Sequence, residues 1–164
     1  MSHAIVRTDN MSGTTDGARL KSGKYMVSTT ETAIDNGCVV TIDGLISGET
    51  EIFKAVTPAA STAFDALYLV ASPEINYEKN YANLDTFVNK AGDTLRLYQL
   101  VAGNTYSVTA EALDGTPAVG KIVEAQAKVT PKVVASLTSG STQIGKIIAK
   151  ETVGSKDYFV ILVG

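Results

Sequence analysis

The sequence contains little of the side-chain chemistry on which most enzymes and metal proteins depend. Among 164 residues it has one cysteine, Cys38, one histidine, His3, and no tryptophan. A single cysteine excludes an internal disulfide framework and a cysteine-rich zinc site, and a single histidine removes most acid–base and metal-ligand chemistry. The composition therefore predicts a protein that is not an enzyme and that uses no metal or cofactor.

Long hydrophobic runs are also missing. The longest, such as residues 67–71 and 158–163, fall far short of the roughly 20 residues that a membrane-spanning helix needs. The first residues lack the apolar segment of a signal peptide, so we expect synthesis and folding in the cytosol and no membrane partner. A net charge of −3 at pH 7 argues against binding to nucleic acid.

What the sequence has in abundance is β-branched residues, since Val, Ile and Thr supply 47 of its 164 positions. These residues favour strands, and turn signals such as Asn36-Gly37, Asp43-Gly44 and Gly103-Asn104 separate the short apolar runs. The pattern predicts a single mainly β domain, an antiparallel sandwich or barrel. The expected strands cover residues 38–43, 49–54, 67–71, 94–101, 105–113, 119–124, 144–150 and 158–163. The last of these is apolar on both faces, which is typical of a central, fully covered strand.

Two short helices are expected within this β-rich chain. Thr57-Pro58 supplies a cap residue and a proline at the first helical position, before several good helix formers at residues 59–67. Apolar side chains recur at helical spacing over residues 81–91.

The first 24 residues are rich in Ser, Thr, Asp, Asn and Gly, and this composition predicts an extended N-terminal arm ahead of a β-rich domain over residues 25–164. Formal charge divides unevenly along the chain: residues 1–24 carry a net +2, residues 25–120 a net −8, and residues 121–164 a net +3. Scatter over a solvated surface accounts for this division, and docking of basic ends against acidic neighbours is the functional alternative.

Several residues match chemical sites in part, but the residues around them do not fit the chemistry. Residues 140–146 match the G-x-x-x-x-G-K phosphate loop, but Ile147 replaces the hydroxyl residue that holds magnesium and a strand follows where a helix is needed. Glu49 and Glu51 are expected on a solvated strand face. Cys38 shares a strand face with Val40 and Ile42 and is expected to be buried, whereas His3 is expected to be a mobile, exposed terminal residue.

The β-rich body resembles the capsid decoration proteins of tailed bacteriophages. The segments that carry this resemblance are residues 89–93 (NKAGD), 96–98 (RLY), 103–108 (GNTYSV), 144–147 (IGKI) and 157–161 (DYFVI). It implies a structural protein on the outer surface of a virion that clamps neighbouring major capsid subunits. It also implies a homo-oligomer, because many members of the family are trimers around local three-fold axes.

Within the expected arm, six residues are candidates for contact with a capsid neighbour. They combine a short apolar patch, which would add a strand to a sheet edge, with four basic side chains: Ile5, Val6, Arg7, Arg19, Lys21 and Lys24. Two other functions remain open from the sequence, a phage tail tube subunit and a carbohydrate-binding or adhesin module. Tube subunits usually carry a long hairpin loop, and a sugar-binding module would need an exposed aromatic platform.

Overall fold

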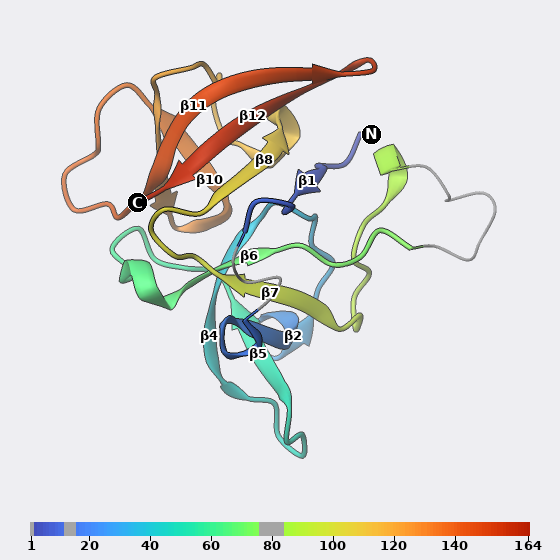
Figure 1. The fold of residues 1–164 in the computed structure, drawn as a ribbon. Coiled ribbons are helices and arrows are strands. Elements are labelled where there is room, and N and C mark those ends of the chain that lie inside the picture. Colours follow the sequence, from blue (N-terminus) through green and yellow to red (C-terminus); the bar gives the residue numbers. More distant parts are fainter. Residues whose placement is uncertain (1, 12–15, 76–83) are drawn as a thin grey trace.

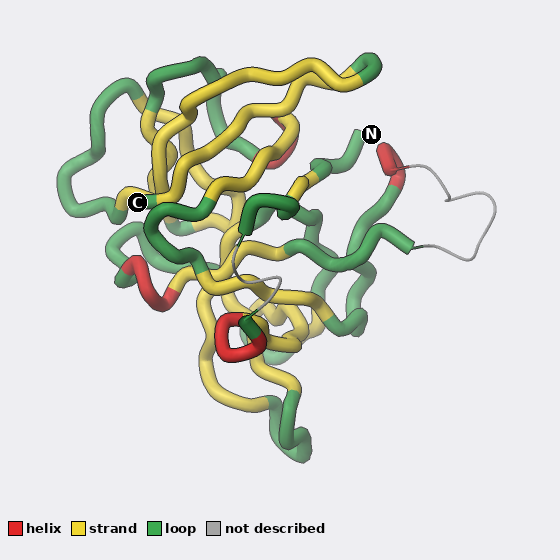
Figure 2. Tube along the Cα trace, viewed as in Figure 1, coloured by secondary structure: helices red, strands yellow, loops and turns green. Residues whose placement is uncertain are grey.

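The computed structural model describes residues 2–11, 16–75 and 84–164, and the chain within them is mainly β (Figures 1 and 2). Strands make up 44% of the residues and helical turns 8%. This confirms the mainly β class expected from the sequence. The β-strands form two six-stranded groups that pack against each other.

The first group is an open antiparallel sheet, drawn in the upper part of Figure 1. Its strand order is β1-β8-β12-β11-β9-β10. The bounds of these strands are β1 Val6–Arg7, β8 Thr105–Thr109, β9 Ile122–Gln126, β10 Lys128–Val134, β11 Gln143–Val153 and β12 Lys156–Val163. We call this group the open sheet.

The second group closes into a barrel, because β7 pairs with β2 as well as with β6. The ring of pairings runs β2–β5–β4–β6–β7 and back to β2, and β3 is attached to the edge of β2. The bounds are β2 Leu20–Val27, β3 Thr30–Glu31, β4 Val39–Leu45, β5 Ile52–Val56, β6 Leu67–Val70 and β7 Leu95–Gln99. Among the named strands of the described chain, only β2 and β5 run parallel to each other.

Two apolar cores follow from the alternation of side chains along these strands. In β4, Val40 points into the barrel with Cys38, whereas Val39 packs in the layer between the barrel and the open sheet. A glycine makes room in the barrel interior: a Cβ on Gly23 would lie 2.7 Å from Leu97 Cδ1. The layer between the two groups is the larger core and joins them into one body.

The structure corrects the expectation of an extended N-terminal arm. Residues 6–7 form β1 on the edge of β8, and Ala4, Ile5 and Met11 are each at most 3% exposed. The expected domain boundary after residue 24 falls inside β2, a strand of the barrel. The average composition of the first 24 residues did not predict these contacts, because a few apolar side chains at the right positions are enough to attach a polar segment to a sheet edge.

The helices are shorter than expected. Residues 59–67 contain only a 3-10 turn, η3 (Phe64–Ala66), and the Thr62 hydroxyl accepts a hydrogen bond from the Ala59 amide at 2.8 Å, which competes with helical pairing. Residues 81–83 lie outside the described part of the chain, and the remainder of that expected helix contains the 3-10 turn η5 (Leu84–Thr86). Two further 3-10 turns are η2 (Gly17–Arg19) and η6 (Ala110–Ala112), and η6 ends β8 four residues earlier than expected.

The last strand, β12, lies between β11 and β8 and is central, as expected. It is not covered on both faces, however, because Leu162 is 40% exposed and Val160 is only partly buried. The barrel covers one face of the open sheet. The other face of the open sheet is exposed at Leu162.

Candidate interaction surface

Aliphatic side chains gather on the outer face of the open sheet, the face turned away from the barrel. Their inward-pointing neighbours, such as Val123, Ile147 and Ile161, are fully buried, so by alternation the residues between them point outward. Strand register brings the outward residues side by side, because Lys146 lies opposite both Leu162 and Ile122. We call this set the outer aliphatic face: Ile122, Val134, Ile148, Val160 and Leu162, with Lys146 among them.

The outer aliphatic face is open to solvent at its centre. Ile148 is 45% exposed and Leu162 is 40% exposed, while the other three aliphatic members are partly buried. Ile148 follows the inward-pointing Ile147 and therefore points outward by alternation, and it lies at a register shift in β11 between Ile147 and Ala149. A soluble protein rarely leaves several aliphatic side chains together on one exposed sheet face without a partner for them.

Lys146 is the unpaired cation of this face. Among the described residues it makes no ion pair, whereas Lys150 on the same strand lies 2.7 Å from Asp157. Arg7, at the β1 edge of the sheet, pairs with Asp9 at 3.2 Å and with Glu151 at 3.5 Å. Lys150 and Arg7 therefore have carboxylate partners within the chain, whereas Lys146 is left for a partner.

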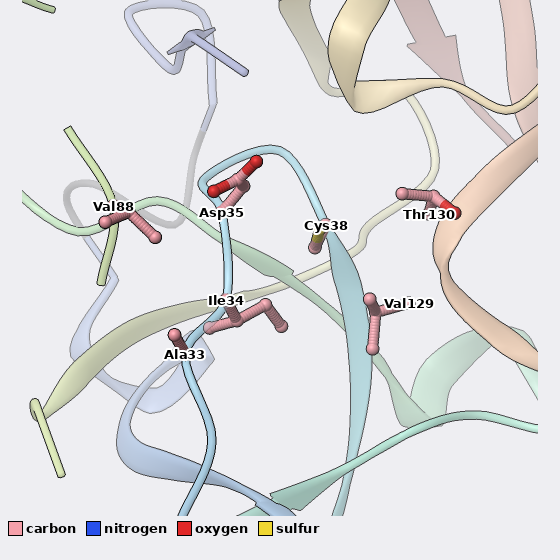
Figure 3. Close-up of a pocket in the computed structure, with 7 residues that line it drawn as sticks. All are labelled: Ala33, Ile34, Asp35, Cys38, Val88, Val129 and Thr130. Atoms are coloured by element: carbon pink, nitrogen blue, oxygen red, sulfur yellow. The ribbon is translucent and has the colours of Figure 1, made fainter. Parts of the chain in front are cut away.

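A mainly apolar depression with a volume of about 340 Å³ lies between the start of β4 and β10 (Figure 3). Val88 and Val129 line it from opposite sides, with Cys38 and Ile34 between them and Asp35 nearby. Burial, with a smaller contribution from the Asp35 charge, raises the pKa of the Cys38 thiol to about 12. The thiol is therefore protonated at neutral pH and unsuited to nucleophilic chemistry. Cys38 is buried beside Val40, as the sequence predicted.

His3 is not the mobile terminal residue that its position suggested. Its Nδ1 lies 2.7 Å from Asp35 Oδ1, its side chain is 30% exposed, and its backbone N–H donates to the Asp85 carbonyl at 2.9 Å. The pair ties the start of the chain to the turn before β4. No group of three or more His, Cys, Asp or Glu residues in the described ranges is arranged to hold a metal ion.

The six residues predicted to contact a neighbour are mostly engaged within their own chain. Ile5 is buried, Val6 pairs with Val108 in the sheet, and Arg7 is bound as described above. The other three also have partners: Arg19 with Asp16 at 3.2 Å, Lys24 with Glu31 at 3.0 Å, and Lys21 5.7 Å from the centroid of the Phe53 ring. Their role toward a neighbour stays a prediction.

The remaining sequence candidates are structural or solvated. Residues 139–140 form a turn and lead into β11 at Gln143, with Ile147 fully buried, so the phosphate-loop match is followed by a strand. Glu49 and Glu51 lie on the exposed connection between β4 and β5. The one deeply buried carboxylate among the described residues, Glu124, accepts hydrogen bonds from the Thr138 amide and hydroxyl and thereby fixes a loop over the sheet.

Sequence reasoning missed the outer aliphatic face, although its signal was present. The expected strands at residues 144–150 and 158–163 carry apolar residues on both faces. That pattern indicates either two covered faces or one face kept for a partner, and only the three-dimensional layering distinguishes them.

No helix in the described part of the chain is long and apolar enough to cross a membrane. No protein-family model, curated protein or solved structure matches this chain.

Proposed function

We propose that this chain is a structural virion protein that binds the outer surface of a tailed-phage capsid and stabilises the shell. The observation that carries the proposal is the outer aliphatic face. A cluster of exposed aliphatic side chains on a rigid sheet is suited to contact with another protein surface. Such a protein works by binding alone, and its affinity is multiplied when many copies bind a repeating lattice.

The surface chemistry favours this role over the enzyme and sugar-binding alternatives. The apolar depression holds a protonated thiol, which argues against nucleophilic catalysis. Sugar recognition calls for exposed aromatic rings, and four of the five described tyrosines are at most 8% exposed: Tyr25, Tyr98, Tyr106 and Tyr158. The outer aliphatic face itself contains no aromatic residue. Both features support a protein-contact role, with the major capsid protein and further copies of this chain as the partners.

A tail tube subunit is the second candidate, and one structural feature favours it. Strands β11 and β12 form a long hairpin of eleven and eight residues whose tip extends beyond the body of the molecule (Figure 1). Long hairpins are typical of tube subunits, which line up in stacked rings. We rank the tail tube role second because the outer aliphatic face is not confined to this hairpin. It lies at the base of the hairpin and continues onto β9 and β10, so the exposed apolar surface belongs to the sheet as a whole.

Two measurements on particles of the virus that encodes the chain test the proposal. Quantitative mass spectrometry of purified virions should give a copy number that follows the capsid lattice, and the purified protein should co-sediment with empty heads that lack it. A copy number matching stacked hexameric rings would replace the proposal with the tail tube role. Failure to bind heads, together with glycan-array binding, would replace it with the adhesin role.

A further inference from the structure

We infer that the outer aliphatic face receives the β4–β5 hairpin of a second copy of this chain, so that copies associate head to tail. This inference deepens the proposed function and rests on it, because it names one partner for the surface that carries the proposal. The hairpin segment, residues 43–52, is called the acidic hairpin below.

The acidic hairpin is the most prominent projection of the barrel and extends away from it at the bottom of Figure 1. It carries Asp43, Glu49 and Glu51 and no basic residue, and Leu45 at its base is 48% exposed. Glu49 and Glu51 make no ion pair within the described residues. The acidic hairpin therefore combines exposed apolar surface with unpaired carboxylates.

The conformation of the hairpin is set before any partner binds. The Ile46 amide donates to the Ile52 carbonyl at 3.0 Å, and the Glu49 amide donates to the Ile46 carbonyl at 2.9 Å. Gly48 has a φ of 86°, a left-handed conformation that glycine adopts without strain. A preformed loop loses less conformational entropy on binding than a flexible one.

The two surfaces match in chemistry. The outer aliphatic face offers apolar area around one unpaired ammonium group, Lys146, and the acidic hairpin offers apolar side chains beside unpaired carboxylates. Docking two outer aliphatic faces against each other would instead bring Lys146 close to the same lysine of the other copy. Like charges in a contact of low polarity are strongly unfavourable, so a head-to-tail contact is favoured over a symmetric one.

The contact must form between copies rather than within one. The acidic hairpin leaves the barrel on the side away from the open sheet, and the two lie at opposite ends of the molecule in Figure 1. A heterologous contact of this kind generates a closed ring when the rotation between copies allows closure. Either a ring or a lattice-guided array suits a protein that covers a repeating shell.

Charge-reversal substitutions test the inference in purified protein. Self-association is measured by analytical ultracentrifugation over a concentration series. Wild-type protein should self-associate, and the dissociation constant should rise at least about tenfold in Lys146→Glu and in the Glu49→Lys/Glu51→Lys double variant. An equimolar mixture of these two variants should associate again, because each supplies the surface that the other has lost. Lys128→Glu is the control for the charge reversal itself: this 65% exposed lysine on β10 lies outside the outer aliphatic face and pairs with Asp114 at 3.2 Å, and its variant should self-associate as the wild type does.

The outcomes separate this inference from the proposed function. Wild-type protein that stays monomeric, or variants that do not restore association when mixed, would overturn the inference. Loss of head binding in Lys146→Glu with a monomeric wild type would also overturn it, and would assign the face to the capsid protein. Head-to-tail association without binding to empty heads would support the inference and contradict the proposed function instead. Circular dichroism establishes that each variant is folded.

Discussion

Cys38 shows how burial decides the chemistry of a single side chain. Its environment raises the thiol pKa from an ordinary value of 9.0 to about 12, mainly by removing it from water. Below pH 9 the thiol is protonated in both the folded and the unfolded chain, so it adds no pH dependence to stability. Between pH 9 and 12 the unfolded chain releases a proton that the folded chain retains, and folding becomes less favourable.

We therefore predict that the free energy of unfolding falls by about 1.4 kcal/mol per pH unit through this single group between pH 9 and 12. The measurement is urea unfolding at pH 8 and pH 10 for the wild type and for Cys38→Ala. Other groups titrate in both proteins, so the difference between the two proteins isolates the thiol. An equal difference at both pH values would show that the folded thiol ionises normally.

Tyr106 provides a second prediction at the scale of one atom. Its side chain is 2% exposed, and its hydroxyl has no hydrogen-bond partner among the described residues. Burial also raises the pKa of this hydroxyl. A buried polar group without a partner destabilises the folded state, so Tyr106→Phe should raise the free energy of unfolding by about 1 kcal/mol.

The control for this prediction is Tyr25→Phe. The Tyr25 hydroxyl lies 2.9 Å from Thr57 Oγ1, so its removal should lower stability by about 1 kcal/mol. Both substitutions remove one oxygen atom and keep the ring. Urea unfolding curves that shift in the same direction for the two variants would contradict the assignment of Tyr106 as the unsatisfied group.

At the scale of elements, Asn36 joins three segments that are distant in sequence. Its amide Nδ2 donates to the Ser72 carbonyl at 2.9 Å, and its Oδ1 accepts from the Ser72 amide at 3.0 Å and from Asn89 Nδ2 at 3.1 Å. Asn36 is fully buried, and Asn89 is 2% exposed. A fully satisfied buried network of this kind fixes the position of the loops that it connects.

Replacing Asn36 with Ala should lower the free energy of unfolding by about 3 kcal/mol, because it leaves the buried Ser72 amide and carbonyl without their Asn36 partner and removes one of the two hydrogen bonds of Asn89 Nδ2. The measurement is a double-mutant cycle with Asn89→Ala, in which urea unfolding gives the stability of each variant. The two effects should add to more than the effect of the double variant, since the two residues share a hydrogen bond. Simple additivity would mean that the two amides act independently.

The sequence predicted some strands well because their local pattern and their burial agree. For residues 38–43, 67–71 and 158–163, apolar character marks strands that the structure places within one or two residues, and nearby glycine turns add to the signal at the first and the last of these. Strand β2 was missed because Lys21, Gly23 and Lys24 interrupt its apolar pattern, and the glycine is explained only by the leucine that fills the barrel beside it. Strand β10 was missed because it contains Pro131 and two lysines, which suit a sheet edge.

The candidate surface was less predictable than the strands. Each residue of the outer aliphatic face lies in a sequence pattern that a buried core strand would also produce. Whether such a strand has one covered face or two depends on which other elements pack on it, and that depends on contacts across the whole chain. The hairpin charges were visible in the sequence, but their projection from the barrel was not.

At the scale of the whole molecule, the barrel and the open sheet share one core. Leu67 and Leu69 from the barrel pack in the same buried layer as Ile147 and Ile161 from the open sheet. The described residues of the N-terminal segment contribute Ala4 and Met11 to that layer. The first residues of the chain are thus part of the structure that holds the two groups together, rather than an appendage to it.

Deleting residues 2–11 should therefore destabilise the entire protein. The deletion removes the edge strand β1 and three side chains that are at most 3% exposed, Ala4, Ile5 and Met11. Burial of large apolar side chains contributes about 1.5–3 kcal/mol each, so we expect a loss of about 4 kcal/mol and a melting temperature lower by about 10 °C.

Arg7→Ala is the control, because its exposed ion pairs should contribute at most about 1 kcal/mol. Thermal unfolding followed by circular dichroism measures both variants. Unchanged melting of the deletion variant would show that this segment is a detachable arm, as its composition suggests, and that the contacts of Ile5 and Met11 add little to the folded state.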